Sequence, residues 1–344
     1  MIVMNRMKQI KKPVLVCLIL GLFGLLLVCR MQVQAGAAYG LRLFGTVLVP
    51  SLFPFAVLAQ MAAMLPADLP GKPVRPFLSI SPSGWTVLLL GWLGGYPIGA
   101  QLLSAQAACG RRSREEALRL SLICSNAGPA FVIGTVGGAL LGQWRSGVAL
   151  WIIHLTASGL AAAVVGRFLP IKQKDFPSSV STALPGSSLF PEAVRAAVQG
   201  MLQVGGTVVF FSVLLEVLHP FAQALGLPLW LQALCGGLLE LSNGVFLTRG
   251  LAPDVQWILL SAMTGFGGLC VQAQLAAFLA GAQLPILPGL LSKLLQGVFA
   301  AGLTAAIVHI GTGSGVVWIG LVSGLMFFLF FVKKDWKMRK LVVK

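Results

Sequence analysis

Gly94-Gly95-Tyr96-Pro97-Ile98-Gly99 interrupts an apolar segment that runs over residues 85–105. Glycine and proline break helices, and non-helical backbone persists at membrane depth only where it is buried in protein or lines a cavity. We therefore predict that this segment is a re-entrant hairpin, made of two half-helices that turn at these residues. This prediction governs the topology because it sets the orientation of every span that follows.

The composition excludes a water-soluble enzyme. The chain has 344 residues, of which 57% are hydrophobic and 10% are charged, whereas soluble domains carry about 25% charged residues. The mean hydropathy is +0.90, and the apolar runs are about as long as a membrane-crossing helix. We predict an all-α polytopic membrane protein. The other apolar segments lie at about 14–28, 38–63, 117–141, 147–168, 196–218, 229–248, 256–280, 287–310 and 315–332.

The distribution of charge gives the topology. The chain has 25 lysines and arginines against nine acids, and basic loops stay on the cytoplasmic side. Ten full crossings would put the loop with Arg111, Arg112 and Arg114 outside. If segments 85–105 and 229–248 are both re-entrant, that loop and both basic tails lie inside. We therefore predict eight crossings and two hairpins, both termini cytoplasmic, and no nucleic-acid partner.

The first apolar segment, from Val14 to Val28, is compatible with a cleaved signal peptide, but we favour an uncleaved first span.

The same order of segments then recurs in two halves: a span, a hairpin, an interrupted span and a span. Each half crosses three times, so the second is inverted relative to the first. Inverted repeats with interrupted helices are typical of secondary transporters. The predicted parts are a basic segment with the first span (1–36), the first repeat (37–169), a cytoplasmic linker (170–193), the second repeat (194–311), and a last span with a basic tail (312–344).

The interruptions are the candidate binding elements. The first is Ser125-Asn126-Ala127-Gly128-Pro129, where Pro129 removes a backbone donor. The second is Thr264-Gly265-Phe266-Gly267-Gly268, where three glycines loosen the helix. Half-helix N-termini at such breaks favour an anionic or strongly polar ligand, and freed carbonyls favour a coupling cation. Close helix packing is the alternative interpretation of these glycines and prolines.

Few acidic side chains fall inside the apolar segments. Glu240 precedes the predicted tip of the second hairpin at Leu241-Ser242-Asn243-Gly244, and a charge there is costly unless it is paired or solvated. We expect Glu240 to contact a cation, a proton or the substrate; a hydrogen bond that fixes the hairpin is the alternative. We expect Glu216 to be interfacial. Hydrolase, zinc-protease and P-loop motifs are absent from the sequence, so we do not expect an enzyme.

Several of these stretches resemble the nucleoside-recognition (Gate) family. They are Gly95-Tyr96-Pro97-Ile98-Gly99-Ala100, Ser125-Asn126-Ala127-Gly128-Pro129, Leu52-Phe53-Pro54-Phe55, Gly237-Leu238-Leu239-Glu240 and Gly265-Phe266-Gly267-Gly268-Leu269. Each is short, but they occur in the right order over residues 38–310. The family is similar in architecture to concentrative nucleoside transporters, in which two hairpins and two interrupted helices surround the substrate. Its sporulation member is associated with moving dipicolinate across the outer forespore membrane.

The resemblance implies a site at both tips and both breaks. The substrate-binding candidates are Gly95, Tyr96, Pro97, Ser125, Asn126, Ser242, Asn243, Thr264, Gly265, Gly267 and Gly268, and those for a coupling ion or proton are Glu240 and Asn126. We expect a transporter of a small anion, with dipicolinate as the substrate, set in the lipid bilayer. No metal site or cofactor is expected beyond Na⁺ or H⁺ as the coupling ion, and a homo-oligomer is an open alternative. A cation-coupled nucleoside or metabolite carrier and a non-transporting sporulation protein are the competing functions.

Overall fold

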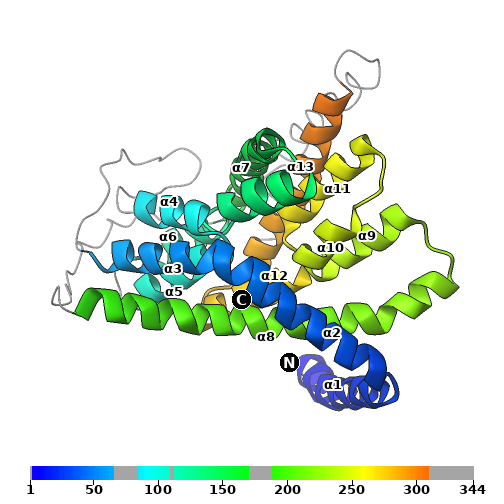
Figure 1. The fold of residues 1–344 in the computed structure, drawn as a ribbon. Coiled ribbons are helices and arrows are strands. Elements are labelled where there is room, and N and C mark those ends of the chain that lie inside the picture. Colours follow the sequence, from blue (N-terminus) through cyan, green and yellow to red (C-terminus); the bar gives the residue numbers. More distant parts are fainter. Residues whose placement is uncertain (1, 66–83, 109–111, 170–187, 310–344) are drawn as a thin grey trace.

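The computed structural model describes residues 2–65, 84–108, 112–169 and 188–309, and this part of the chain is helical without a β-strand (Figure 1). Its helices are long and apolar enough to cross a membrane at Arg30–Met64, Trp144–Gly166, Leu189–Ala224, Pro253–Gly281 and Ile286–Val308. An integral membrane protein with an all-helical fold is therefore confirmed.

The predicted number of crossings is only partly matched by these five helices. The apolar part of the first helix, α1 (Ile2–Val28), is shorter, at Pro13–Val28. The predicted span 117–141 is not one continuous helix, and the predicted span 315–332 lies outside the described residues. Eight crossings, the orientation of the termini and the re-entrant nature of the hairpins remain predictions.

The first half contains one long helical segment and one helical hairpin. The long segment joins α2 (Arg30–Leu43), the π-helical turn η1 (Phe44–Leu48) and α3 (Val49–Met64), so it begins eight residues before the predicted start at residue 38. The hairpin consists of α4 (Gly84–Gly94) and α5 (Ile98–Ala108), and its turn falls at Gly95-Tyr96-Pro97, as predicted. Its location in a membrane stays a prediction.

The first break has the position that Pro129 predicts. Helix α6 (Arg114–Ser121) ends in a non-helical stretch over residues 122–128, and Pro129 leads into the π-helical segment η2 (Ala130–Leu140). Ser113 begins α6 by accepting a hydrogen bond from the backbone N–H of Glu116 at 3.2 Å. Arg112, which the sequence places in a cytoplasmic loop, is buried and pairs with Glu116 at 3.0 Å. Helix α7 (Trp144–Gly166) completes this half.

The second half begins with the longest helix, α8 (Leu189–Ala224), which lies along α2 and α3 (Figure 1). Its start inside the predicted linker 170–193 has a simple reason, because Pro191 is tolerated in the first turn of a helix. The remaining helices are α9 (Leu229–Leu239), α10 (Leu241–Leu247), α11 (Pro253–Phe266), α12 (Gly268–Gly281) and α13 (Ile286–Val308).

The turn of the second hairpin differs from its predicted position. The chain turns at Glu240, which has an extended backbone, and Leu241 to Gly244 already belong to α10. The carboxylate of Glu240 starts α10 as its N-cap, which moves the turn one residue earlier than glycine and asparagine preferences suggest. The second break lies at Gly267, between α11 and α12, where φ is +85° and favours glycine.

The first hairpin is held tightly on the first break by glycine. A Cβ atom built on Gly99 would lie 2.0 Å from the carbonyl oxygen of Cys124, and one on Gly91 would lie 2.1 Å from the same atom. The indole of Trp92 also donates to the carbonyl of Ile123 at 2.9 Å. Both arms of the hairpin therefore contact the same short stretch of unwound chain.

A candidate solute site between the hairpin tips and the helix breaks

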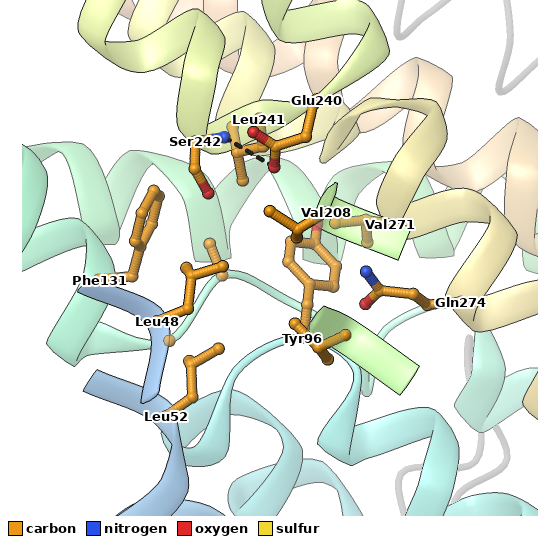
Figure 2. A pocket seen from close by; sticks show the side chains of 13 residues that line it. Leu48, Leu52, Tyr96, Phe131, Val208, Glu240, Leu241, Ser242, Val271 and Gln274 are labelled. Atoms are coloured by element: carbon orange, nitrogen blue, oxygen red, sulfur yellow. Dashed lines mark hydrogen bonds between the residues drawn. The ribbon is translucent and has the colours of Figure 1, made fainter. Parts of the chain in front are cut away.

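A small cavity lies where the two halves meet. The space inside it that the centre of a water molecule can occupy is about 40 Å³, enough for a few waters. Its walls come from both hairpin tips, the first break, α3, α8 and α12. The lining residues shown in Figure 2 include Leu52, Tyr96, Phe131, Val208, Glu240, Ser242 and Gln274.

Tyr96 connects the first tip to the second break. It is buried, and its hydroxyl donates to the carbonyl oxygen of Thr264 at 3.4 Å. A Cβ atom on Gly267 would lie 3.3 Å from Cζ of Tyr96, so glycine leaves room for the ring. Next to it, Gly95 packs directly on Gly128 of the first break. The first tip thus touches both interrupted helices.

The first break contains a buried polar network that is turned away from this cavity. The side chain of Asn126 accepts from Gln296 Nε2 at 2.8 Å and from Lys293 Nζ at 3.2 Å. The carbonyl oxygen of Ser125 accepts from the same ammonium. His154 on α7 accepts from the backbone N–H of Ala127 at 3.1 Å. Neither Ser125 nor Asn126 lines the cavity, although Ala127 and Gly128 do.

The second tip is organised around the carboxylate of Glu240, which is buried. Its Oε1 accepts from the backbone N–H of Ser242 at 3.1 Å, and its Oε2 accepts from the backbone N–H of Asn243 at 2.7 Å. The side-chain amide of Asn243 donates to Oε2 at 2.7 Å and to Ser212 at 2.9 Å. The carboxylate therefore accepts from the backbone N–H groups of Ser242 and Asn243, two of the substrate-binding candidates. The hydrogen bond that fixes the hairpin, the alternative role of Glu240, is present.

The second break is packed with small residues. The hydroxyl of Thr264 donates to the carbonyl of Leu260 at 2.7 Å within its own helix, and Thr264 does not line the small cavity. A Cβ atom on Gly265 would lie 2.8 Å from the Cα atom of Gly297, and one on Gly268 would lie 2.7 Å from the carbonyl of Gly237. These glycines allow α13 and the second hairpin to approach the break closely. Close helix packing is the alternative interpretation that the sequence offered for them.

A second, larger cavity lies on the other side of the second tip. The space that water centres can occupy there is about 430 Å³, between α2, α8, α9 and α10. Asn243 lines this cavity, whereas Glu240 and Ser242 line the small one. Glu216 and His219 also line this larger cavity. The expectation that Glu216 lies at the membrane interface stays a prediction. The tip of the second hairpin thus separates the two spaces.

The chain is similar to the sporulation integral membrane protein YlbJ of Bacillus subtilis (strain 168). The two are 29% identical over 304 residues, which covers 76% of this chain and 74% of the relative. No protein-family model matches the chain, and no solved structure matches it. The similarity supports a membrane protein of sporulation.

Several residues at the site were not anticipated. Gln274 lines the cavity and donates to Thr207 at 2.7 Å, and Lys293 and Gln296 hold the first break. Lys293 lies inside the apolar segment 287–310, and a lysine at that place is unusual enough to be a signal of function or pairing. The sequence does not single out Gln274 in the same way, because an uncharged glutamine in a span can serve many kinds of polar contact.

Proposed function

We propose that this protein is a secondary transporter that moves a small polar anion, dipicolinate, across a membrane of the sporulating cell. The observation that carries the proposal is a cavity bordered by both hairpin tips and the first break, with the second break in contact through Tyr96. We infer that the two halves are inverted repeats around this cavity. The matching order of span, hairpin, broken helix and span in the described residues supports that inference.

The size of the cavity requires movement. A space of about 40 Å³ holds water but not an aromatic dicarboxylate, since ligand pockets are usually several hundred cubic ångströms in volume. The structure therefore corresponds to a closed form. The larger cavity beyond Asn243 supports a route of entry there, opened when the second hairpin shifts against α2 and α8. An elevator-like or rocking movement of the hairpins and broken helices would expose the site alternately to the two sides.

Electrostatics support a coupling role for Glu240. It is the one carboxylate among the residues that line the small cavity, and two like charges 4 Å apart repel by about 4 kcal/mol at an effective dielectric constant of 20. An anion can enter only when Glu240 carries a proton or a cation. This requirement links the binding of H⁺ or Na⁺ to the binding of the anion, which is the essential property of a coupled carrier.

The same carboxylate is the specific observation that favours a second candidate, a cation-coupled nucleoside carrier. A neutral nucleoside offers hydroxyl donors to Glu240 and has no charge to be repelled. Ser242 and Gln274 would supply further hydrogen bonds at the same cavity. The anion and the nucleoside therefore differ in whether the free carboxylate helps or opposes binding.

Dipicolinate content in spores of the host tests the proposal. The gene is deleted and replaced by wild type, by Glu240→Gln, or by Ser113→Ala, which removes a different N-cap and leaves the carboxylate in place. We expect the deletion and Glu240→Gln to leave dipicolinate in the mother cell, while wild type and Ser113→Ala restore it to the spore. Membrane levels of each variant are measured by immunoblot.

Normal spore dipicolinate in the deletion strain would contradict the substrate, and a nucleoside uptake screen would then decide between the two carriers. Full restoration by Glu240→Gln would contradict a coupling role for Glu240. Suppose the deletion impairs sporulation, Glu240→Gln restores it in full, and the distribution of dipicolinate is the same in every strain. A structural protein of the sporulation membrane then explains the result better than a carrier.

A further inference from the structure

Lys293 is a lysine buried inside an apolar helix. Its side chain on α13 is 1% exposed, and among the described residues no ion pair joins it to an aspartate or a glutamate. A charged side chain at membrane depth costs several kcal/mol unless the protein solvates it, and such residues usually have a function. Its surroundings therefore identify what compensates the charge.

Three oxygen atoms surround the ammonium. Lys293 Nζ donates to the backbone carbonyl of Ser125, to Oδ1 of Asn126 at 3.2 Å and to Oε1 of Gln296 at 2.7 Å. A lysine ammonium has three N–H donors and no acceptor, so each donor has one oxygen. The ring of Tyr96 adds a fourth favourable contact, with its centroid 5.4 Å from Nζ.

The helix break creates this oxygen cluster. The carbonyl of Ser125 would normally accept from the backbone N–H four residues later, but that residue is Pro129, which has none. The two amides are oriented by the same network: Gln296 Nε2 donates to Asn126 Oδ1 at 2.8 Å, and both amide oxygens then face Lys293. Asn126 Nδ2 donates to the carbonyl of Ile123 at 2.7 Å, which fixes that side chain in turn.

One backbone carbonyl and two amide oxygens converging on a point are ligands of the kind that a hard monovalent cation takes. Unwound carbonyls at helix breaks are also the places where coupling ions bind in transporters. We propose that the ammonium of Lys293 is a covalently attached substitute for a metal cation at the first helix break. The position is permanently filled, so Na⁺ neither binds there nor is needed to hold the break together.

This inference rests on the proposed function only for its consequence in transport. Asn126 was expected to bind a coupling ion, and its oxygen is instead bound by Lys293 and Gln296. A second positive charge beside the ammonium would be repelled, as like charges are at short range. Coupling is therefore left to Glu240 alone, and the first break contributes a fixed positive charge to the protein around the anion.

Thermal unfolding of the purified full chain in detergent tests the proposal without any substrate. Wild type and Glu240→Gln are compared in NaCl and in choline chloride, because choline is too large for the position. We expect no difference in Tm between the two salts, apart from any Na⁺ effect on wild type that Glu240→Gln abolishes. Lys293→Ala removes three carbons and the ammonium, and n-propylammonium is the missing fragment. We expect a large fall in Tm for Lys293→Ala and a saturable recovery of about 2–4 °C or more with n-propylammonium.

The controls separate charge from volume. n-Propanol has the size of n-propylammonium without its charge and should give no recovery. Lys293→Met fills the volume without a donor and should remain destabilised. Leu294→Ala, at a neighbouring position that is 45% exposed, should respond to none of the additives.

Three results would overturn the proposal. A saturable rise in Tm with Na⁺ that persists in Glu240→Gln would show that an ion binds away from Glu240, where the proposal leaves no ion site. Stability of Lys293→Met equal to wild type, or equal recovery with n-propanol, would show that the side chain only fills space. A failure to transport dipicolinate would count against the proposed function and leave these stability results unaffected.

Discussion

Gly99→Ala is the substitution that most sharply tests the packing of the first hairpin. The new methyl carbon would lie 2.0 Å from the carbonyl oxygen of Cys124 and 2.6 Å from its carbonyl carbon. Both are backbone atoms, so no side chain can rotate away. Reaching an ordinary contact of 3.4 Å requires a separation of about 1.4 Å between α5 and the unwound chain.

The expected loss of stability follows from that geometry. Overpacking a close contact costs about 1–3 kcal/mol, and each kcal/mol lowers Tm by about 2–4 °C in domains of moderate size. The same displacement also moves Tyr96, which is attached to the hairpin and contacts Thr264. We therefore expect Gly99→Ala to lower both Tm and the rate of transport.

Gly159→Ala is the matched control, because it lies within α7 and no atom is within 4 Å of its Cβ position. Alanine favours a helix interior over glycine by about 0.5–1 kcal/mol, so this variant should unfold at the same or a slightly higher temperature. Both are measured by fluorescence-monitored unfolding in the same detergent. If Gly99→Ala matches Gly159→Ala in Tm and in transport, the described contact between the hairpin and the break is wrong.

Three further substitutions examine the polar groups of the site. Tyr96→Phe removes one long hydrogen bond to Thr264, so unfolding should change by less than about 1 kcal/mol while the KM of uptake rises; a large loss of Tm would mean that the hydroxyl is mainly structural. Gln296→Leu leaves buried donors and acceptors around Lys293 unsatisfied and should cost about 1–3 kcal/mol in unfolding experiments, and an unchanged Tm would refute the network. Gln274→Leu removes a polar group from the cavity wall and should weaken solute affinity by about 2- to 10-fold in competition binding, whereas unaltered affinity would place the solute elsewhere.

The breaks and the first tip could be predicted because local chemistry determines them. Pro129 removes a helix donor wherever the segment lies, and Gly267 adopts a φ of +85° that other residues rarely take. The turn at Gly95-Tyr96-Pro97 follows from the same preferences. These features depend on a few neighbouring residues, so the sequence contains the information without a tertiary structure.

The partners of polar side chains could not be predicted in the same way. Asn126 meets Lys293 and Gln296 across more than 160 positions of sequence, and only the packing of α13 on the first break brings them together. The role of Glu240 is intermediate: its capping contacts to Ser242 and Asn243 are local. From the sequence this capping role was only the alternative for Glu240. The cost of burying a carboxylate favoured contact with a cation, a proton or the substrate.

Uptake of radiolabelled dipicolinate into proteoliposomes that contain only this protein measures transport in the absence of every other component of the sporulating cell. Wild type and Glu240→Gln are reconstituted in matched amounts, with Ser113→Ala as the control for loss of an N-cap. We predict saturable uptake by wild type and Ser113→Ala that unlabelled dipicolinate suppresses and a nucleoside does not. Glu240→Gln should lose the dependence of uptake on the imposed H⁺ or Na⁺ gradient. Uptake no greater than in protein-free vesicles, under every gradient applied, would contradict the account.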